Sequence, residues 1–372
     1  MNFVIFGLSV SSSWGNGHAT LWRGLCRALA ARSHSVTFFE QDAPYYRAAR
    51  DLYELESGAL VLYRTWSEIE PQARLALRHA DAAIVTSYCP DGPAAAELVL
   101  EATRGKRIFY DLDTPVTLAA LESSESPRYL PPRGLAEFDL VLSFTGGRAL
   151  ELLKEKLGAR CVAPLYGHAD PQQHRAVTPD AAFRGALSYL GTYSADRQEQ
   201  VEELFISPAR AATNQRFLIA GSMYPQTIEW PPNVVHFSHL PPTTHSTFFC
   251  STRLTLNVTR ATMARFGFCP SGRLFEAAAC GAAIVSDWFE GLDQFFDPWQ
   301  EVIVVRSRQD VLAALELSDR ELRARAERTR ERMLACHTAQ HRARELEGLI
   351  WPGERALAPT FDGGQRVRDA EV

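Results

Sequence analysis

The first half of the chain repeats one pattern: a short run of continuous apolar residues, a turn, and a longer segment with helical spacing. Continuous rather than alternating apolar strands indicate a parallel sheet that helices cover on both faces. The pattern therefore predicts a doubly wound α/β domain. Strands are expected at 2–7, 35–40, 59–63, 82–86, 107–111, 139–143 and 160–164, and helices include 19–31, 93–103 and 148–157.

The same alternation resumes after residues 165–183, where the periodicity lapses into His, Pro, Gln and Asp. Such a composition is typical of a linker. A chain of 372 residues also exceeds what one core usually supports. We therefore predict a second, similar domain, with strands at 186–191, 216–221, 233–237, 253–258, 282–286 and 301–305, a helix at 194–205 and helical residues at about 318–349.

The charge pattern bears on possible partners. A formal net charge of −5 argues against binding of duplex nucleic acid, which requires a clustered excess of Lys and Arg. Arginines do crowd residues 320–332, but they alternate with glutamates there. That alternation predicts a solvated helix with i,i+3 and i,i+4 ion pairs, and a phosphate-binding face is the alternative.

Seven scattered cysteines, with no C-x-x-C pair, predict free buried thiols and a reducing compartment. The apolar start of the chain lacks a basic leader and is expected to be a first strand rather than a signal peptide. No run approaches the ~20 apolar residues that span a bilayer. A cytoplasmic location is therefore expected.

The stretch PSGRLFEAAACGAAIVSD at 270–287 predicts a short helix followed by a strand. With Ser271 as N-cap, Leu274 packs inward, and Arg273 and Glu276 share another face. The free amides at such a helix start suit a diphosphate, which Gly272 allows to approach closely. A carboxylate one turn deeper suits ribose hydroxyls, so the stretch favours a nucleotide sugar. The alternative is a plain i,i+3 ion pair between Arg273 and Glu276.

The loop SVSSSWGNGHAT, at 9–20, raises a rival interpretation. Gly15 and Gly17 precede a helix, and Glu40 ends the next strand, as in a dinucleotide-binding fingerprint. Thr20 replaces the third glycine, however, and the second domain would be left without a role. The rival interpretation is therefore weaker, but the loop residues stay candidates for a cleft.

Asp111 and Asp113 end the strand in YDLDTPVT, and their spacing places both on one side of an extended segment. We expect Asp113 to face a cleft, where a carboxylate orients sugar hydroxyls, serves as a base or stabilises positive charge at the sugar. The alternative is that both cap the next turn or pair with Arg107. Apart from this triplet, no D-x-D with further metal ligands is evident, so no essential metal is expected.

The stretch RLFEAAACGAAIVSDWFEGLDQFF resembles the nucleotide-binding core of GT-B glycosyltransferases. Five strings in order resemble the bacterial CgeB-like glycosyltransferases over residues 3–305: SSWGNGHATLWRGLCRALAARSHSVTFFEQDAPYY, YDLDTPVT, SYLGTYSADRQ, LNVTRATM and PSGRLFEAAACG. The resemblance implies two Rossmann-like domains that face a central cleft, with Glu276 on the donor ribose. Many retaining members carry a second glutamate where this chain has Phe268, so retention of anomeric configuration is unsupported.

The resemblance also implies roles for the polar residues. For Asn257 and Arg260 the alternative is that they cap the next turn. For Arg197 it is a surface position with an ion pair to Asp196 or Glu199. For His18 it is a helix cap or a hydrogen-bonded core residue. Under the resemblance His18 and Asp113 are catalytic, with His18 as the base, and Gly15, Gly17 and Asp111 lie at the acceptor side of the cleft. The donor nucleotide is expected at Gly191, Arg197, Asn257, Arg260, Ser271, Gly272, Arg273, Leu274 and Glu276.

Together these features predict a glycosyltransferase that moves a sugar from a UDP-, GDP- or TDP-sugar to the hydroxyl of an unidentified glycan, protein or small molecule, without cofactor or metal. An epimerase of the same fold and a non-catalytic nucleotide or carbohydrate binder are the alternatives. The predicted domains are an acceptor-side domain at 1–168 and a nucleotide-sugar domain at 169–335. A helix at 336–352 is expected to pack back on the first domain, followed by a tail at 353–372.

Overall fold

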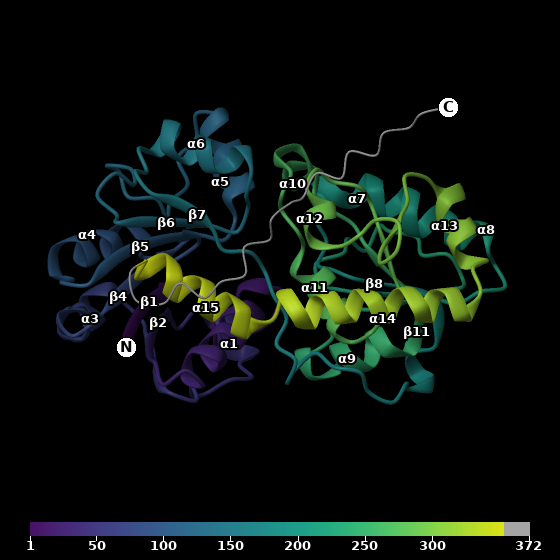
Figure 1. Cartoon of the computed structure of the whole chain (residues 1–372), viewed down its shortest axis with the longest axis horizontal. Coiled ribbons are helices and arrows are strands. Elements are labelled where there is room, and N and C mark those ends of the chain that lie inside the picture. Colours follow the sequence, from purple (N-terminus) through teal and green to yellow (C-terminus); the bar gives the residue numbers. More distant parts are fainter. Residues whose placement is uncertain (353–372) are drawn as a thin grey trace, which may run out of the picture.

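The computed structural model describes residues 1–352 and contains two parallel β-sheets, one in each half of the chain (Figure 1). The tail predicted at 353–372 lies outside the described residues. The first sheet has the order β3-β2-β1-β4-β5-β6-β7. Its strands are β1 (Asn2–Gly7), β2 (Ser35–Gln41), β3 (Gly58–Tyr63), β4 (Ala82–Thr86), β5 (Lys106–Asp111), β6 (Leu140–Ser143) and β7 (Val162–Pro164).

Apolar side chains form a core on each face of this sheet. On one face, residues of α3 and α4 pack on the strands, and on the other face α1 does so. The predicted doubly wound α/β architecture is thereby confirmed, since both faces of a parallel sheet are covered. The helices of this domain are α1 (Gly17–Ala30), α2 (Pro44–Ala48), α3 (Trp66–Arg78), α4 (Gly92–Ala102), α5 (Thr114–Glu122) and α6 (Arg148–Leu157).

The second sheet has the order β10-β9-β8-β11-β12-β13. Its strands are β8 (Gly185–Leu190), β9 (Phe217–Ala220), β10 (Val234–Phe237), β11 (Thr252–Asn257), β12 (Ile284–Ser286) and β13 (Ile303–Val304). The helix predicted at 194–205 continues through a π-helical turn, Glu202–Ile206, into α8. The helices are α7 (Ala195–Val201), α8 (Ser207–Ala211), α9 (Pro242–Ser251), α10 (Ala261–Phe266), α11 (Gly272–Ala279), α12 (Leu292–Phe295), α13 (Arg308–Leu315) and α14 (Asp319–Cys336).

The helical stretch predicted at about 318–349 is two helices. α14 ends at Cys336, and a second helix, α15 (Ala339–Ile350), returns to the first domain and lies along α1 (Figure 1). Ala343 and Leu346 of α15 are fully buried in the core of the first domain. Glu347 accepts hydrogen bonds from Arg32 at 2.5 Å, beyond the end of α1. The last helix therefore ties the two domains together.

The arginines of α14 do not form the ion pairs within the helix that the charge pattern predicts. Arg325 donates to the carbonyl of Trp299 at 2.7 Å, and Arg328 donates to that of Gln300 at 3.0 Å. Arg332 forms an ion pair with Glu301 at 2.7 Å. The loop after α12 offers closer acceptors than the neighbouring glutamates do, so these arginines fix that loop against α14.

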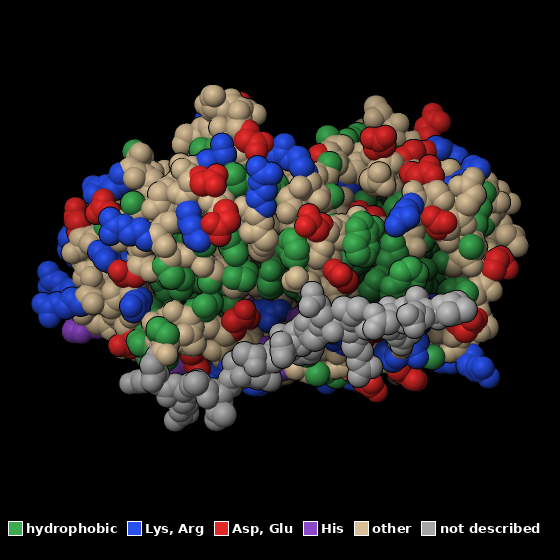
Figure 2. Space-filling view, turned by 45° about the horizontal axis from the view of Figure 1, so that its top comes forward, with side chains coloured by type: hydrophobic (Ala, Val, Ile, Leu, Met, Phe, Trp, Pro, Cys, Tyr) green, Lys and Arg blue, Asp and Glu red, His purple; other side chains and the backbone are tan. Residues whose placement is uncertain are grey.

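The last features of the fold are the distribution of surface charge and the state of the cysteines. Figure 2 shows Lys and Arg mixed with Asp and Glu over the face that it presents, rather than a continuous basic surface. All seven cysteines are free, as predicted, but only Cys26, Cys89, Cys269 and Cys280 are buried and Cys161 is exposed. In the part of the chain that the structure covers, no helix is both long and apolar enough to cross a membrane.

Candidate active site

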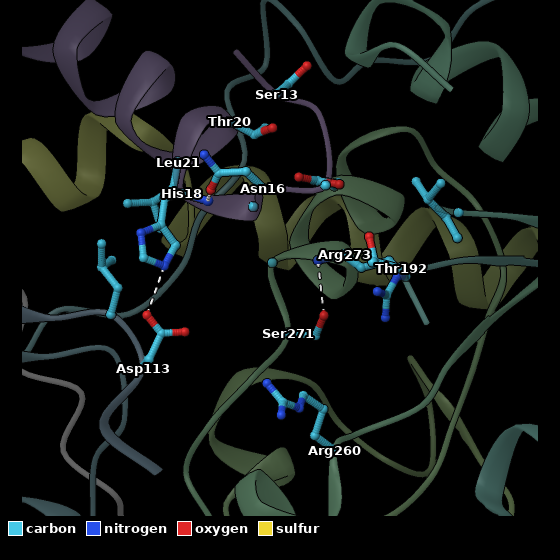
Figure 3. A pocket seen from close by; sticks show the side chains of 18 of the residues that line it. Ser13, Asn16, His18, Thr20, Leu21, Asp113, Thr192, Arg260, Ser271 and Arg273 are labelled. Atoms are coloured by element: carbon cyan, nitrogen blue, oxygen red, sulfur yellow. Dashed lines mark hydrogen bonds and ion pairs between the residues drawn. The ribbon is translucent and has the colours of Figure 1, made fainter. Parts of the chain in front are cut away.

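A cavity of about 480 Å³ lies between the two domains, where loops after the strands of both sheets meet. In open α/β sheets the carboxyl ends of the strands are the usual ligand site. Figure 3 shows His18 and Asp113 from the first domain on one side, and Arg260, Ser271 and Arg273 from the second domain on the other. The structure thus brings candidates from both predicted domains to one cavity.

The start of α11 forms part of the cavity wall. The Ser271 hydroxyl caps the helix by accepting a hydrogen bond from the amide of Arg273 at 3.3 Å. No atom lies within 4 Å of the position that a side chain on Gly272 would occupy, so the backbone is open to a ligand there. Leu274 and Phe275 are fully buried on the opposite face, as predicted, and Glu276 lines the cavity. The helix start thereby presents the Gly272 amide, and the Glu276 carboxylate one turn on, to the same space.

Arg273 lies over the ring of Tyr189, with its guanidinium carbon 5.2 Å from the ring centre. Its Nη1 is 3.5 Å from Oδ1 of Asn257. Burial lowers the pKa of Arg273. Within residues 1–352 no ion pair links Arg273 to Glu276, so the alternative interpretation of a plain i,i+3 ion pair is wrong. Both side chains therefore remain available to a ligand.

Two further arginines of the second domain line the cavity. Arg197 donates to the carbonyl of Thr192 and lies 5.8 Å from the centre of the Tyr189 ring. It is not paired with Asp196, which instead accepts from Arg260 at 3.1 Å. Burial alone would raise the pKa of Asp196, but hydrogen bonds from Ser194 and Arg260 hold it below its ordinary value. The cavity therefore has two cationic positions near Tyr189 and a third at Arg260.

Gly191 lines the cavity where β8 ends. A side chain there would lie 2.8 Å from Nη2 of Arg273 and 2.7 Å from the Tyr189 hydroxyl, so it would displace the Arg273 guanidinium from its present position. Asn257 and Leu274, in contrast, are not part of the cavity wall. Asn257 is buried and donates to Ser286 at 3.0 Å, and Leu274 lies in the core. Asn257 therefore contacts the Arg273 guanidinium from outside the cavity and is not placed to contact a ligand.

The loop after β1 is fixed by Glu40, whose side chain is fully buried. The carboxylate accepts hydrogen bonds from the amides of Val10 and Ser11, at 2.7 and 2.9 Å, and from the Ser11 and Ser9 hydroxyls, at 2.6 and 3.0 Å. Every one of these donors belongs to the chain itself, so the acid is not free to bind a ribose. This geometry removes the basis of the dinucleotide fingerprint.

The same loop presents Gly15, Gly17 and His18 to the cavity. Asn16 caps α1 by accepting from the amide of His18 at 2.9 Å. The imidazole Nε2 of His18 lies 2.8 Å from Oδ2 of Asp113 (Figure 3). Burial alone would raise the pKa of Asp113, but the charge and hydrogen bond of His18 hold it below its ordinary value. The two predicted catalytic residues therefore form one pair.

Asp111 does not face the cavity, contrary to the expectation that it shares a side with Asp113. The chain turns after β5, so the Asp111 side chain is fully buried and accepts from the amide of Asp113 at 3.0 Å. Burial raises the pKa of Asp111 to about 7. Arg107 pairs with Asp139 at 2.7 Å, so the alternative of a pair with Arg107 is also wrong. Asp111 supports the loop that carries Asp113.

Comparisons with known proteins bear on the fold of the chain. The family described as "Glycosyl transferase-like" matches residues 197–348. Sucrose-phosphate synthase from Thermosynechococcus elongatus superimposes with a TM-score of 0.69 at 12% identity, covering 95% of this chain and 98% of that one. The chain has the GT-B fold. HepE from Anabaena, in complex with UDP-glucose, gives a TM-score of 0.65 at 9% identity, covering 95% and 100%. An α-glucosyltransferase with UDP-glucose and DNA gives 0.68 at 11% identity, covering 94% and 98%. No curated protein matches the sequence.

Phe268 has a structural role in this GT-B chain. Its φ is 46°, in the left-handed region, and its ring lies against Gly147 of the first domain and Gly291 of the second. A side chain on either glycine would lie 2.4 Å from the ring. Phe268 therefore packs between the domains of the GT-B fold and does not line the cavity.

No sequence motif points to His245, which lines the cavity on the side of the second domain. Its Nδ1 lies 3.9 Å from Oε2 of Glu276, and its ring is stacked 6.1 Å from that of His174. Burial lowers the pKa of each histidine to about 4. The two histidines come from separate segments with no shared motif, so no sequence signal pairs them.

Proposed function

We propose that the protein transfers a sugar from a nucleoside-diphosphate sugar to an acceptor hydroxyl. The proposal is carried by the placement of α11, Arg197 and Arg260 opposite the His18–Asp113 pair across one interdomain cavity. Anion-binding groups on one side and a proton acceptor on the other are what this transfer requires. The glycosyltransferase-like match over residues 197–348 supports the donor side.

The donor is proposed to lie along the second domain. The free amide of Gly272, with the guanidinium groups of Arg197 and Arg273, binds the diphosphate. Glu276 accepts hydrogen bonds from the ribose hydroxyls. Because these groups supply positive charge to the leaving diphosphate, the transfer is proposed to need no metal ion.

The acceptor is proposed to lie against the first domain, beside Gly15 and Gly17. His18 accepts the proton of the acceptor hydroxyl, and Asp113 orients the imidazole and stabilises it once protonated. Ser87 fixes Asp113 from the other side through a 3.0 Å hydrogen bond. Closure of the two domains would exclude water and limit hydrolysis of the donor.

The finer assignment is to the CgeB-like bacterial glycosyltransferases acting in the cytoplasm. It is supported by the five ordered strings over residues 3–305 and by the free cysteines. The two-domain arrangement, with an acceptor-side domain at 1–168 and a donor domain at 169–335, is part of the same proposal.

A thermal-shift screen of UDP-, GDP- and TDP-sugars tests this function. A ligand at ~100 times its dissociation constant stabilises the folded state by ~2.7 kcal/mol. One donor class is expected to raise the melting temperature of the wild type and to act less on Glu276→Gln. The exposed Glu101 gives a matched control, Glu101→Gln. Absence of any shift, or equal shifts for Glu276→Gln and Glu101→Gln, would contradict the proposed donor site.

A further inference from the structure

Three metal-ligating side chains meet at the donor side of the cavity. One ligand atom each from His174, His245 and Glu276 lies within 4.8 Å of the other two. His174 belongs to the segment between the two sheets, His245 to α9 and Glu276 to α11. The cluster is therefore made by the tertiary structure.

The imidazole of His245 has a defined orientation. Its Nε2 lies 3.2 Å from the carbonyl oxygen of Leu240, so Nε2 carries the hydrogen and donates it. Nδ1 then keeps its lone pair and faces Oε2 of Glu276. A lone pair and a carboxylate oxygen repel each other, and a cation bound between them removes that repulsion. Histidines that bind metals commonly donate their other N–H to a carbonyl in this way.

The imidazole of His174 forms no hydrogen bond within the described residues. Only 1% of its surface is exposed, and among residues 1–352 neither ring nitrogen has a hydrogen-bond partner. The Nδ1 of His245 is likewise unpartnered there. A buried unsatisfied polar group costs ~1–3 kcal/mol, so the meeting of one His174 nitrogen with Nδ1 of His245 beside Glu276 indicates a missing ligand.

The chemistry of the three side chains indicates which metal ion the site would bind. Two imidazoles and one carboxylate suit Zn²⁺ and its neighbours, whereas Mg²⁺ and Ca²⁺ prefer oxygen ligands alone. Ligand atoms of a tetrahedral zinc site lie ~3.3 Å apart, so small side-chain rotations would close this cluster. Because His245 and Glu276 line the cavity, a fourth position would open toward it.

We propose that His174, His245 and Glu276 bind a divalent transition-metal ion, Zn²⁺ in particular. If Glu276 is also the ribose ligand, which rests on the proposed function, ion and donor compete for one carboxylate. The ion then inhibits donor binding and takes no part in sugar transfer.

Cobalt spectroscopy of the full-length, metal-free protein tests the site. Co²⁺ titration is expected to give the visible absorption of a tetrahedral site, which Zn²⁺ then removes. His174→Gln should weaken Co²⁺ binding by at least about 10–100-fold, the cost of losing even a hydrogen-bond partner of a metal ligand, whereas the exposed His79→Gln should leave it unchanged. His245→Gln is a second, independent variant should His174→Gln fail to fold. Absence of the band in the wild type, or equal Co²⁺ affinity for all variants, overturns the proposal.

Competition is tested separately, by measuring UDP affinity with EDTA and with Zn²⁺. His174 does not line the cavity, so with EDTA wild type and His174→Gln should bind UDP equally. Zn²⁺ should weaken UDP binding to the wild type more than to His174→Gln, while any complex between Zn²⁺ and UDP affects both alike. An unchanged UDP affinity overturns the competition. Failure of both proteins to bind UDP, GDP and TDP in EDTA contradicts the proposed function, whereas the cobalt spectrum still decides the metal site.

Discussion

The imidazole Nε2 of His18 lies 2.8 Å from Oδ2 of Asp113, although the two residues are 95 positions apart in the sequence. His18 follows β1, and Asp113 follows β5. In the sheet only β4 lies between these strands, and Ser87, which follows β4, also binds Asp113. Because all three strands are parallel, their carboxyl ends meet at one edge, and the strand order itself makes the pair.

His18→Ala should lower kcat by about 10²–10⁴-fold, the usual contribution of general base catalysis. Donor affinity should change little, because His18 belongs to the first domain, opposite the proposed donor site. Asp113→Asn should also lower kcat, since it removes the charge that stabilises protonated His18. Single-turnover kinetics and UDP titration calorimetry measure the two effects. Equal turnover for His18→Ala and a His79→Ala control would contradict the role of base.

Arg273→Lys should weaken UDP binding by about 10-fold or more, because hydrogen bonds to charged groups contribute ~1.5–3 kcal/mol and lysine lacks the planar fork. Uridine, which has no phosphates, should be affected much less. Calorimetry with both ligands makes the comparison. The control is Arg253→Lys, since Arg253 pairs with Asp319 away from the cavity. A similar loss for uridine and UDP would place Arg273 away from the diphosphate.

Glu40→Gln should destabilise the protein by ~1–3 kcal/mol, because an amide cannot accept from all the loop donors that the buried carboxylate satisfies. The free energy of unfolding in urea measures this. Glu101→Gln, at an exposed position, should stay within ~0.5 kcal/mol of the wild type. Unchanged stability of Glu40→Gln would show that the loop is fixed by other contacts.

Asp111 should make stability depend on pH. Burial raises its pKa from 3.8 in the unfolded chain to about 7 in the fold, so the folded state retains the proton in this range. Its contribution to stability is present at low pH and declines as pH rises from about 4 to about 7. Asp111→Asn cannot ionise, so relative to the wild type it should gain stability between pH 5 and pH 8.

Melting temperatures of wild type and Asp111→Asn at pH 5 and pH 8 measure this difference. Asp293→Asn, at an exposed position, is the matched control and should follow the wild type at both values. If the difference between wild type and Asp111→Asn did not change with pH, the Asp111 carboxyl would have to be ionised in the fold throughout.

Local signals determined the parts of the site that lie within one element. The cap at Ser271, the buried face of α11 and the accessible amide of Gly272 follow from residues within one or two turns of each other, because a helix fixes which side chains share a face. The continuous apolar strands likewise predicted two parallel sheets, since such runs are buried on both faces.

The tertiary structure alone decided which groups meet. Spacing suggested that Asp111 and Asp113 share a side, but the turn after β5 buries one and presents the other. Arg260 forms an ion pair with Asp196, and Glu40 accepts hydrogen bonds from the loop after β1. In both cases the partner that is nearest in space is remote in the sequence. The cluster of His174, His245 and Glu276 had no sequence signal. Hydrophobic patterning is periodic and local, whereas hydrogen bonds and charges act over a few ångströms, and only the packed chain sets those distances.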